Sequence, residues 1–211
     1  MRIGAVAALP LAIQRRLIRR ALALAKGDLR GVDYAHVEQV LELMERPGGD
    51  GRLRLPGPVE ARRSFDWIRI GPASGQPPEP WRIPLGVPGA YALPGGGVVH
   101  LEVARKNATL RAAELSLRRL PATLELRGWR PGDQYCPAGR AHRQKVKEMF
   151  QTARIPSWRR RDWPIVSNGS QIVWARGFGA AAEFAAGREP GPVLRVWEAD
   201  AEVEEGEAGS K

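Results

Sequence analysis

Residues 71–80 read GPASGQPPEP, and this stretch decides how the chain is organised. Its four prolines and two glycines exclude a regular helix or strand, so we predict a linker at residues 72–80. A first domain then covers residues 1–71, and a second domain covers residues 81–199. Residues 200–211 are rich in acidic side chains and poor in apolar ones, and we expect them to form a disordered tail.

Upstream of the linker, residues 9–46 have the spacing of two helices. Apolar side chains recur at helical intervals from Leu11 to Leu22, while the paired arginines of this stretch fall largely on the other face. Asp33 is a suitable N-cap for the second helix. Short strands are expected to follow, at residues 52–55 and within residues 59–70. The first domain is therefore predicted to be a small helical domain with trailing strands.

Downstream of the linker, the pattern changes to short strands with few helices. A helix is predicted at residues 142–153, and the sequence around Asn168-Gly169 predicts a hairpin with a tight turn. The expected strands, including the two of the hairpin, lie within residues 98–103, 123–126, 165–174 and 193–197. Helices segregated from a mixed sheet make the fold class α+β.

The composition is that of a protein able to bury a core. Of its 211 residues, 43% are apolar and 27% are charged. The single cysteine, Cys136, has no internal disulfide partner, and no zinc-ligand spacing is present. No signal peptide or membrane span is apparent, so we expect a cytoplasmic protein with no membrane partner.

Sequence motifs for catalysis are missing. There is no Walker loop, dinucleotide-binding fingerprint or nucleophile elbow, so we predict no catalytic residue, metal ligand or cofactor-binding residue. The three histidines and Cys136 are scattered and are interpreted as structural or exposed. Asp133 and Glu148 could be read as an acid/base pair, but a turn aspartate and a surface glutamate are the simpler interpretations.

Charge is the strongest functional signal in the sequence. Lys and Arg number 33 against 23 Asp and Glu, for a net charge of +10. Residues 198–211 carry six acidic side chains and one lysine, so the rest of the chain has a net charge of +15. Within residues 127–161, ten cations, among them Arg127, face two anions, a balance that favours nucleic-acid binding over a merely solvated face.

Basic side chains and one aromatic from this stretch are the candidate contacts to a nucleic-acid backbone and its bases. Trp163 could also stack on a base, although a tryptophan in such a sequence more often belongs to the core. The candidate binding residues are Arg130, Arg140, Arg143, Lys145, Lys147, Arg154, Trp158, Arg159, Arg160 and Arg161.

At these residues the sequence resembles the C-terminal region of tRNA(Ile)-lysidine synthase. The motifs are LRGWRPGD at residues 126–133, KVK at 145–147, IPSWRRRDWPI at 155–165 and GFG at 177–179. Upstream, the order of Arg15-Arg16, Arg19-Arg20, His36-Val37 and LRLPG at 53–57 resembles the family's helical substrate-recognition domain. The series is specific although no single piece is, and the resemblance covers residues 9–197.

This resemblance implies a two-step ligation in the full-length enzyme. An N-terminal ATP-pyrophosphatase domain, using ATP and Mg²⁺, adenylates the wobble cytidine of tRNA(Ile), and lysine then displaces AMP. Two C-terminal domains recognise the tRNA, the last gripping the acceptor stem. The family's Ser-Gly-Gly-x-Asp-Ser loop is absent here, and residues 73–76 (ASGQ) do not replace it. The resemblance therefore implies a tRNA-binding portion, inactive alone, whose partners are tRNA and the N-terminal catalytic domain.

Within the arginine run, Arg160 best matches the family's loop arginine, whereas Arg159 and Arg161 look like additions. Two other interpretations stay open at this point. The chain could be a stand-alone RNA-binding or scaffolding protein, or a self-sufficient enzyme of another class. The sequence leaves the oligomeric state open.

Overall fold

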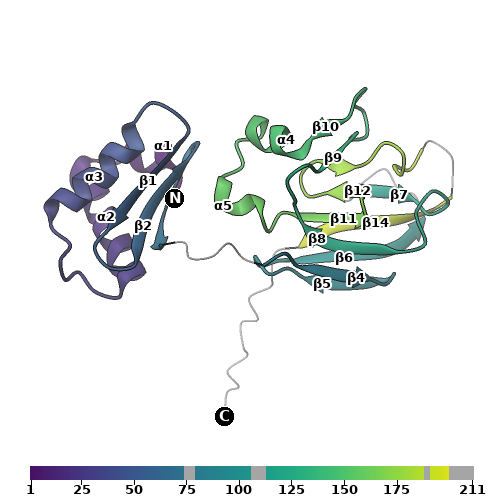
Figure 1. Cartoon of the computed structure of the whole chain (residues 1–211), viewed down its shortest axis with the longest axis horizontal. Helices are drawn as coiled ribbons and strands as arrows, with labels where there is room; N and C mark the ends of the chain where they lie inside the picture. The colour runs from purple at the N-terminus through teal and green to yellow at the C-terminus, as the bar shows by residue number, and fades with distance from the viewer. Residues whose placement is uncertain (74–78, 106–112, 188–190, 200–211) are drawn as a thin grey trace, which may run out of the picture. The chain divides into compact units, whose positions relative to one another are not determined.

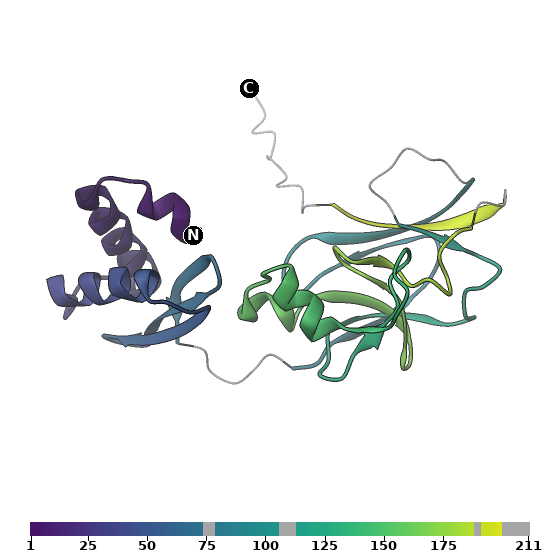
Figure 2. The ribbon, with the colours of Figure 1, turned by 90° about the horizontal axis from the view of Figure 1, so that it is seen from above.

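The computed structural model describes residues 1–73, 79–105, 113–187 and 191–199 (Figures 1 and 2). Most of the expected linker and the expected acidic tail, residues 74–78 and 200–211, lie outside the described residues. The chain divides into two compact units. The first contains Met1–Glu79 and Thr152–Trp158, and the second contains Pro80–Gln151 and Arg159–Lys211. Helices combined with antiparallel sheets confirm the α+β class.

The first unit packs helices against a three-stranded antiparallel sheet of order β1-β2-β3 (Figure 1). Its helices are α1 (Ile3–Ala7), α2 (Leu11–Lys26) and α3 (Tyr34–Glu45). Its strands are β1 (Asp50–Leu55), β2 (Val59–Ser64) and β3 (Trp67–Pro72). The two predicted helices and the trailing strands are confirmed. The structure adds α1, and it divides residues 59–70 between two paired strands where we expected one.

The helix boundaries of this unit follow local rules. Asp33 caps α3: its carboxylate accepts a hydrogen bond from the His36 amide at 3.2 Å, and the Asp33 amide donates to Nδ1 of His36 at 3.2 Å. Gly27 ends α2 at φ 92°, a conformation that glycine adopts without strain. Ile18 of α2 and Val40 of α3 are fully buried in the core against the sheet. His36 therefore has a structural role, as the sequence indicated.

The second unit contains two larger sheets and one small strand pair (Figure 2). The five-stranded sheet, in spatial order, consists of β13 (Gly179–Ala180), β12 (Gln171–Ala175), β11 (Pro164–Asn168), β8 (Leu124–Gly128) and β4 (Arg82–Leu85). The four-stranded sheet consists of β5 (Gly89–Ala92), β6 (Val98–Arg105), β14 (Pro192–Ala199) and β7 (Ala113–Ser116). The remaining elements are β9 (Gln134–Tyr135), β10 (Gln144–Lys145), α4 (Val146–Thr152) and α5 (Ser157–Arg160), which crosses the boundary between the units.

The predicted hairpin is confirmed as β11 and β12, with its turn displaced by one residue. Asn168 pairs with Gln171 at the end of the ladder, so Gly169 and Ser170 form the turn. Of these turn residues only Gly169 has positive φ, at 56°. Glycine at the first turn position with positive φ is typical of a type II′ turn, whereas an Asn-Gly turn would be type I′.

The helix predicted at residues 142–153 is shorter than expected. Residues 144 and 145 pair as β10 with β9, and the Val146 amide donates to the Asp133 carbonyl at 2.9 Å. These contacts with a distant segment override the helical periodicity of the first turn. Val146 and Phe150 form the buried face of α4, whereas Ala153 is exposed and lies outside the helix.

Candidate nucleic-acid interface

A buried arginine organises the segment that carries most of the candidate residues. Arg127, on β8, is 1% exposed, and both ends of its guanidinium face the Asp133 carboxylate. Nη1 and Nη2 donate to the two carboxylate oxygens at 2.8 and 2.9 Å. Such a bidentate, charge-assisted pair satisfies a buried charge that would otherwise be very costly. Arg127, one of the ten cations counted in residues 127–161, is therefore buried and not part of the exposed basic surface.

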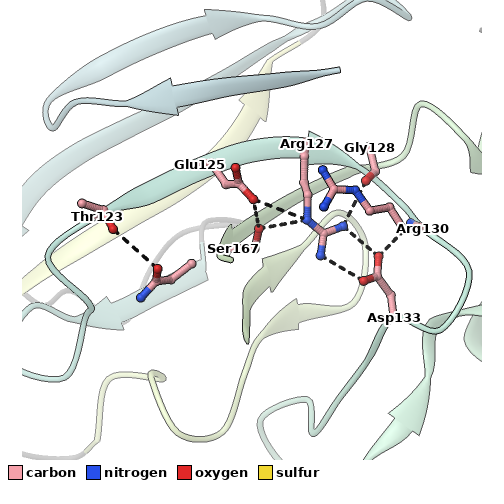
Figure 3. Close-up of polar contacts among 8 residues, drawn as sticks. Thr123, Glu125, Arg127, Gly128, Arg130, Asp133 and Ser167 are labelled. Atoms are coloured by element: carbon pink, nitrogen blue, oxygen red, sulfur yellow. Dashed lines mark hydrogen bonds and ion pairs between the residues drawn. The ribbon is translucent and has the colours of Figure 1, made fainter. Parts of the chain in front are cut away.

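Other polar groups of the sheet fix the same guanidinium (Figure 3). Its Nε donates to Oγ of Ser167 at 3.0 Å, and Nη1 also donates to the Gly128 carbonyl at 3.1 Å. The Ser167 hydroxyl in turn donates to Glu125 at 3.2 Å. Because β8 and β11 are adjacent strands, these contacts hold Arg127 in one orientation against the sheet.

Asp133 connects this buried arginine to the exposed loop. Its carboxylate accepts a hydrogen bond from the Arg130 amide at 2.8 Å, which closes the Arg-Pro-Gly-Asp turn. Its carbonyl accepts from the Val146 amide, where α4 begins. The interpretation of Asp133 as a turn residue is confirmed, and its ion pair with Arg127 is a feature that the sequence analysis missed.

The strand pair β9–β10 places Lys145 opposite the residue that follows Asp133. Lys145 is opposite Gln134 in the ladder, and the Arg143 guanidinium donates to the Gln134 carbonyl at 3.4 Å. Lys145 and Lys147 are both exposed, and Nζ of Lys145 lies 3.9 Å from the Glu148 carboxylate. A contact of this length between exposed groups contributes little, so it leaves the lysine charge available to a ligand.

A cluster of aromatic rings packs around Phe150 of α4. Phe150 is fully buried, with ring centres of Trp129 and Trp163 at 5.4 Å and of Phe178 at 5.7 Å. Trp163 is 7% exposed, and its Nε1 donates to the Arg176 carbonyl at 2.8 Å. Trp163 therefore belongs to the core, and the suggestion that it stacks on a base is wrong.

Arg160 rests on this aromatic cluster. Its guanidinium carbon lies 5.8 Å from the centre of the Phe150 ring, and the residue is half-buried. Arg159 and Arg161, its neighbours, are exposed. The three arginines thus differ in environment although they are adjacent in sequence.

Arg154 and Trp158 lie in the segment Thr152–Trp158, which groups with the first unit. Arg154 is exposed, and its guanidinium donates to both carboxylate oxygens of Asp66 at 2.5 and 2.6 Å. These hydrogen bonds lower the pKa of Asp66 and raise that of Arg154. Trp158 is half-buried.

Other polar residues of the loop have structural contacts. Burial raises the pKa of Tyr135, whose hydroxyl donates to the Gly179 carbonyl at 3.2 Å. Cys136 is half-buried, and its Sγ lies 3.2 Å from the carbonyl of Arg140, an exposed residue. Within the described ranges, no three His, Cys, Asp or Glu side chains come together as a metal site. No helix in this part of the chain is both long and apolar enough to cross a membrane.

Two family models match the chain, one for each part of its sequence. The model described as the TilS substrate binding domain matches residues 1–68, and the model described as the TilS substrate C-terminal domain matches residues 124–196. The chain belongs to the tRNA(Ile)-lysidine synthase family. It carries the domains of the C-terminal part of these proteins, as the resemblance predicted.

Proteins named tRNA(Ile)-lysidine synthase align over most of the chain. The protein from Solibacter usitatus is 46% identical over 208 residues, which are 94% of this chain and 47% of the relative. That from Geobacter sulfurreducens is 31% identical over 194 residues, 89% of this chain and 41% of the relative. The chain thus spans less than half the length of these relatives.

The fold is also found in a solved structure. The crystal structure of a TILS C-terminal domain superposes with a TM-score of 0.53 at 24% sequence identity, covering 58% of this chain and 98% of that one. This similarity concerns the fold alone.

Proposed function

We propose that this chain is the tRNA-recognition portion of a tRNA(Ile)-lysidine synthase and binds tRNA on its acceptor-stem side. A separate N-terminal catalytic domain then ligates lysine to the wobble cytidine with ATP, in the cytoplasm. The observation that carries the proposal is the exposure of Lys145 and Lys147 at the junction of β10 and α4, within a segment dominated by cations. The match of residues 124–196 to the family's C-terminal domain supports it.

The chemistry of the interface suits a phosphate backbone better than a small substrate. Flexible ammonium groups and guanidinium forks contact phosphates without reading bases, and binding releases counterions from the RNA. Such contacts need no titrating catalytic group. The requirement is instead that several cations are held at defined positions, which β9, β10 and the start of α4 provide.

Charge reversal at the two lysines tests the proposal. In the whole 211-residue chain, Lys145→Glu with Lys147→Glu should weaken tRNA binding and lower the salt slope by about two units, one for each lost phosphate contact. Both side chains are exposed, so the thermal midpoint should change little. Fluorescence anisotropy with labelled tRNA over a range of salt concentrations measures both affinity and slope.

A matched control separates local contact from overall charge. Arg118 and Arg119 are exposed in the turn after β7, in the same unit, and their reversal to glutamate changes the net charge by the same amount. We expect the control to alter binding much less than the lysine variant. Equal losses in the two variants, or an unchanged slope and affinity in the lysine variant, would contradict the proposed interface.

A further inference from the structure

The buried ion pair of Arg127 and Asp133 joins a strand of the five-stranded sheet to the loop that carries the cations. We propose that Arg127 and Asp133 are positioning residues for tRNA binding: they hold Arg130, Lys145 and Lys147 at fixed places without contacting the RNA themselves. This inference rests on the proposed function and concerns the same interface.

The Asp133 carboxylate has a fixed orientation. The guanidinium of its partner, Arg127, also donates through Nε to Ser167 and through Nη1 to the Gly128 carbonyl. A planar guanidinium with two parallel hydrogen bonds to a carboxylate permits one geometry. The side chain of Asp133 is only 10% exposed, so water competes little for it.

Both ends of the loop that carries the cations, near residues 130 and 146, form hydrogen bonds with Asp133. At one end, its carboxylate receives the Arg130 amide, and its own amide donates to the Arg130 carbonyl at 3.1 Å. At the other end, its carbonyl receives the Val146 amide, between Lys145 and Lys147 in sequence. The chain from residue 130 to residue 147 is thereby closed on a single anchored residue.

The free energy of a buried ion pair is consistent with a positioning role. A buried ion pair often gives little net stability, because desolvation offsets its attraction, and fixing a unique geometry is one attested reason for a protein to keep such a pair. Long basic side chains lose conformational freedom on binding phosphates. Ordering a loop on binding costs free energy as well, and a backbone already held in its bound geometry avoids that second cost, so the pair should increase affinity more than it increases stability.

The test compares two ion pairs of the same unit. Arg195 and Glu114 join β14 to β7 at 3.3 Å, with side chains 11% and 17% exposed, and they belong to the other sheet. Asp133→Asn and Glu114→Gln each leave a largely buried arginine facing a neutral amide. Both variants of the whole chain are expected to lower the thermal midpoint, and affinity is measured well below both midpoints.

We expect Asp133→Asn to weaken tRNA binding about tenfold and to lower the salt slope by about one unit, as cations lose their positions. Glu114→Gln should leave affinity within about twofold and the slope unchanged. Arg127→Lys, which keeps the charge but loses the paired hydrogen bonds, should weaken binding in the same direction, and it carries the test if Asp133→Asn does not fold.

The outcomes separate this inference from the proposed function. A wild-type chain without salt-dependent tRNA binding would refute the proposed function, and the positioning role with it. A wild-type chain that binds, with Asp133→Asn or Arg127→Lys binding equally well at the same slope, would refute the positioning role alone. Equal losses in the Asp133 and Glu114 variants would also overturn it, because they would show an effect of stability only.

Discussion

Among Arg159, Arg160 and Arg161, replacement of Arg160 is the most informative, because its side chain also has a contact within the fold. Its guanidinium rests over the Phe150 ring, whereas Arg159 and Arg161 are exposed. We predict that Arg160→Ala lowers both tRNA affinity and thermal stability. Arg159→Ala and Arg161→Ala should lower each by less.

The two effects have separate magnitudes. A cation over an aromatic face contributes about 0.5–1 kcal/mol, and the half-buried stem of Arg160 adds some packing, so the stability loss should be about 1 kcal/mol. In a domain of this size that lowers the Tm by roughly 2–6 °C. Loss of a charge-assisted phosphate contact costs about 1–3 kcal/mol, or roughly 5- to 150-fold in Kd.

Differential scanning fluorimetry and anisotropy titration of the three alanine variants measure the two effects in parallel. Arg160→Lys is a useful control, because it retains the charge and loses the planar fork. If Arg160→Ala lowers the midpoint but leaves the affinity at the wild-type value, the loop is structural and our assignment of Arg160 to tRNA binding is wrong. If affinity falls with an unchanged midpoint, the contact with Phe150 contributes no stability.

Three further measurements test the packing of the second unit, the cap of α3 and the absence of catalysis in this chain. Gly128→Ala should destabilise the second unit by about 1–3 kcal/mol in urea unfolding, because the new Cβ would press on the backbone carbonyl oxygen of Arg161; an unchanged midpoint would show that this packing is looser than the structure has it. The His36 amide lowers the pKa of Asp33, so the cap of α3 should stabilise the first unit above about pH 4 and be lost as the pH falls further; circular dichroism should show this acid-range loss in the wild type and not in Asp33→Ala. Incubated with ATP, Mg²⁺, lysine and tRNA(Ile), the purified chain should form no lysidine by nucleoside mass spectrometry, and its formation would contradict the assignment of catalysis to a separate domain.

Elements with strong local signals were predictable from sequence. The helices α2 and α3 have long apolar stripes, and α3 has an aspartate cap. The strands β6 and β14 each contain valine and leucine side chains among polar ones, and the β11–β12 hairpin has a glycine turn. In α2, α3 and the hairpin, a single short window contains both the periodicity and a residue that marks a boundary of the element.

Elements that depend on distant partners were not predictable. The helix α1 has only five residues and no side-chain cap, and its first amide bonds to the carbonyl of Asp66. The strand β10 has two residues, and only pairing with β9 makes it a strand. Nothing local distinguishes Gln144-Lys145 from the first turn of α4, since both residues are good helix formers.

The candidate site, too, was predictable only in part. The number of its cations could be read from the sequence, but which of them lie at the surface and which one is buried could not. Arg127 occupies a position of β8 where the paired residue of β11 is Ile165, and burial there depends on a carboxylate six positions later. A strand arginine followed by an Arg-Pro-Gly-Asp turn was the available signal, because the turn aspartate can reach back to the strand.

Only the cations outside the core can contact a phosphate, so the count of basic residues exceeds the number of possible contacts. In the second unit, the basic run retains only the cations that face solvent or lie half-buried at its edge. They are Arg130, Arg140, Arg143, Lys145, Lys147, Arg159, Arg160 and Arg161. If each met one phosphate, the logarithmic salt slope would be roughly −6 to −7. A steeper slope would therefore require contacts beyond these eight cations. Arg154 and the exposed arginines of α2, which are Arg16, Arg19 and Arg20, would be the first to examine.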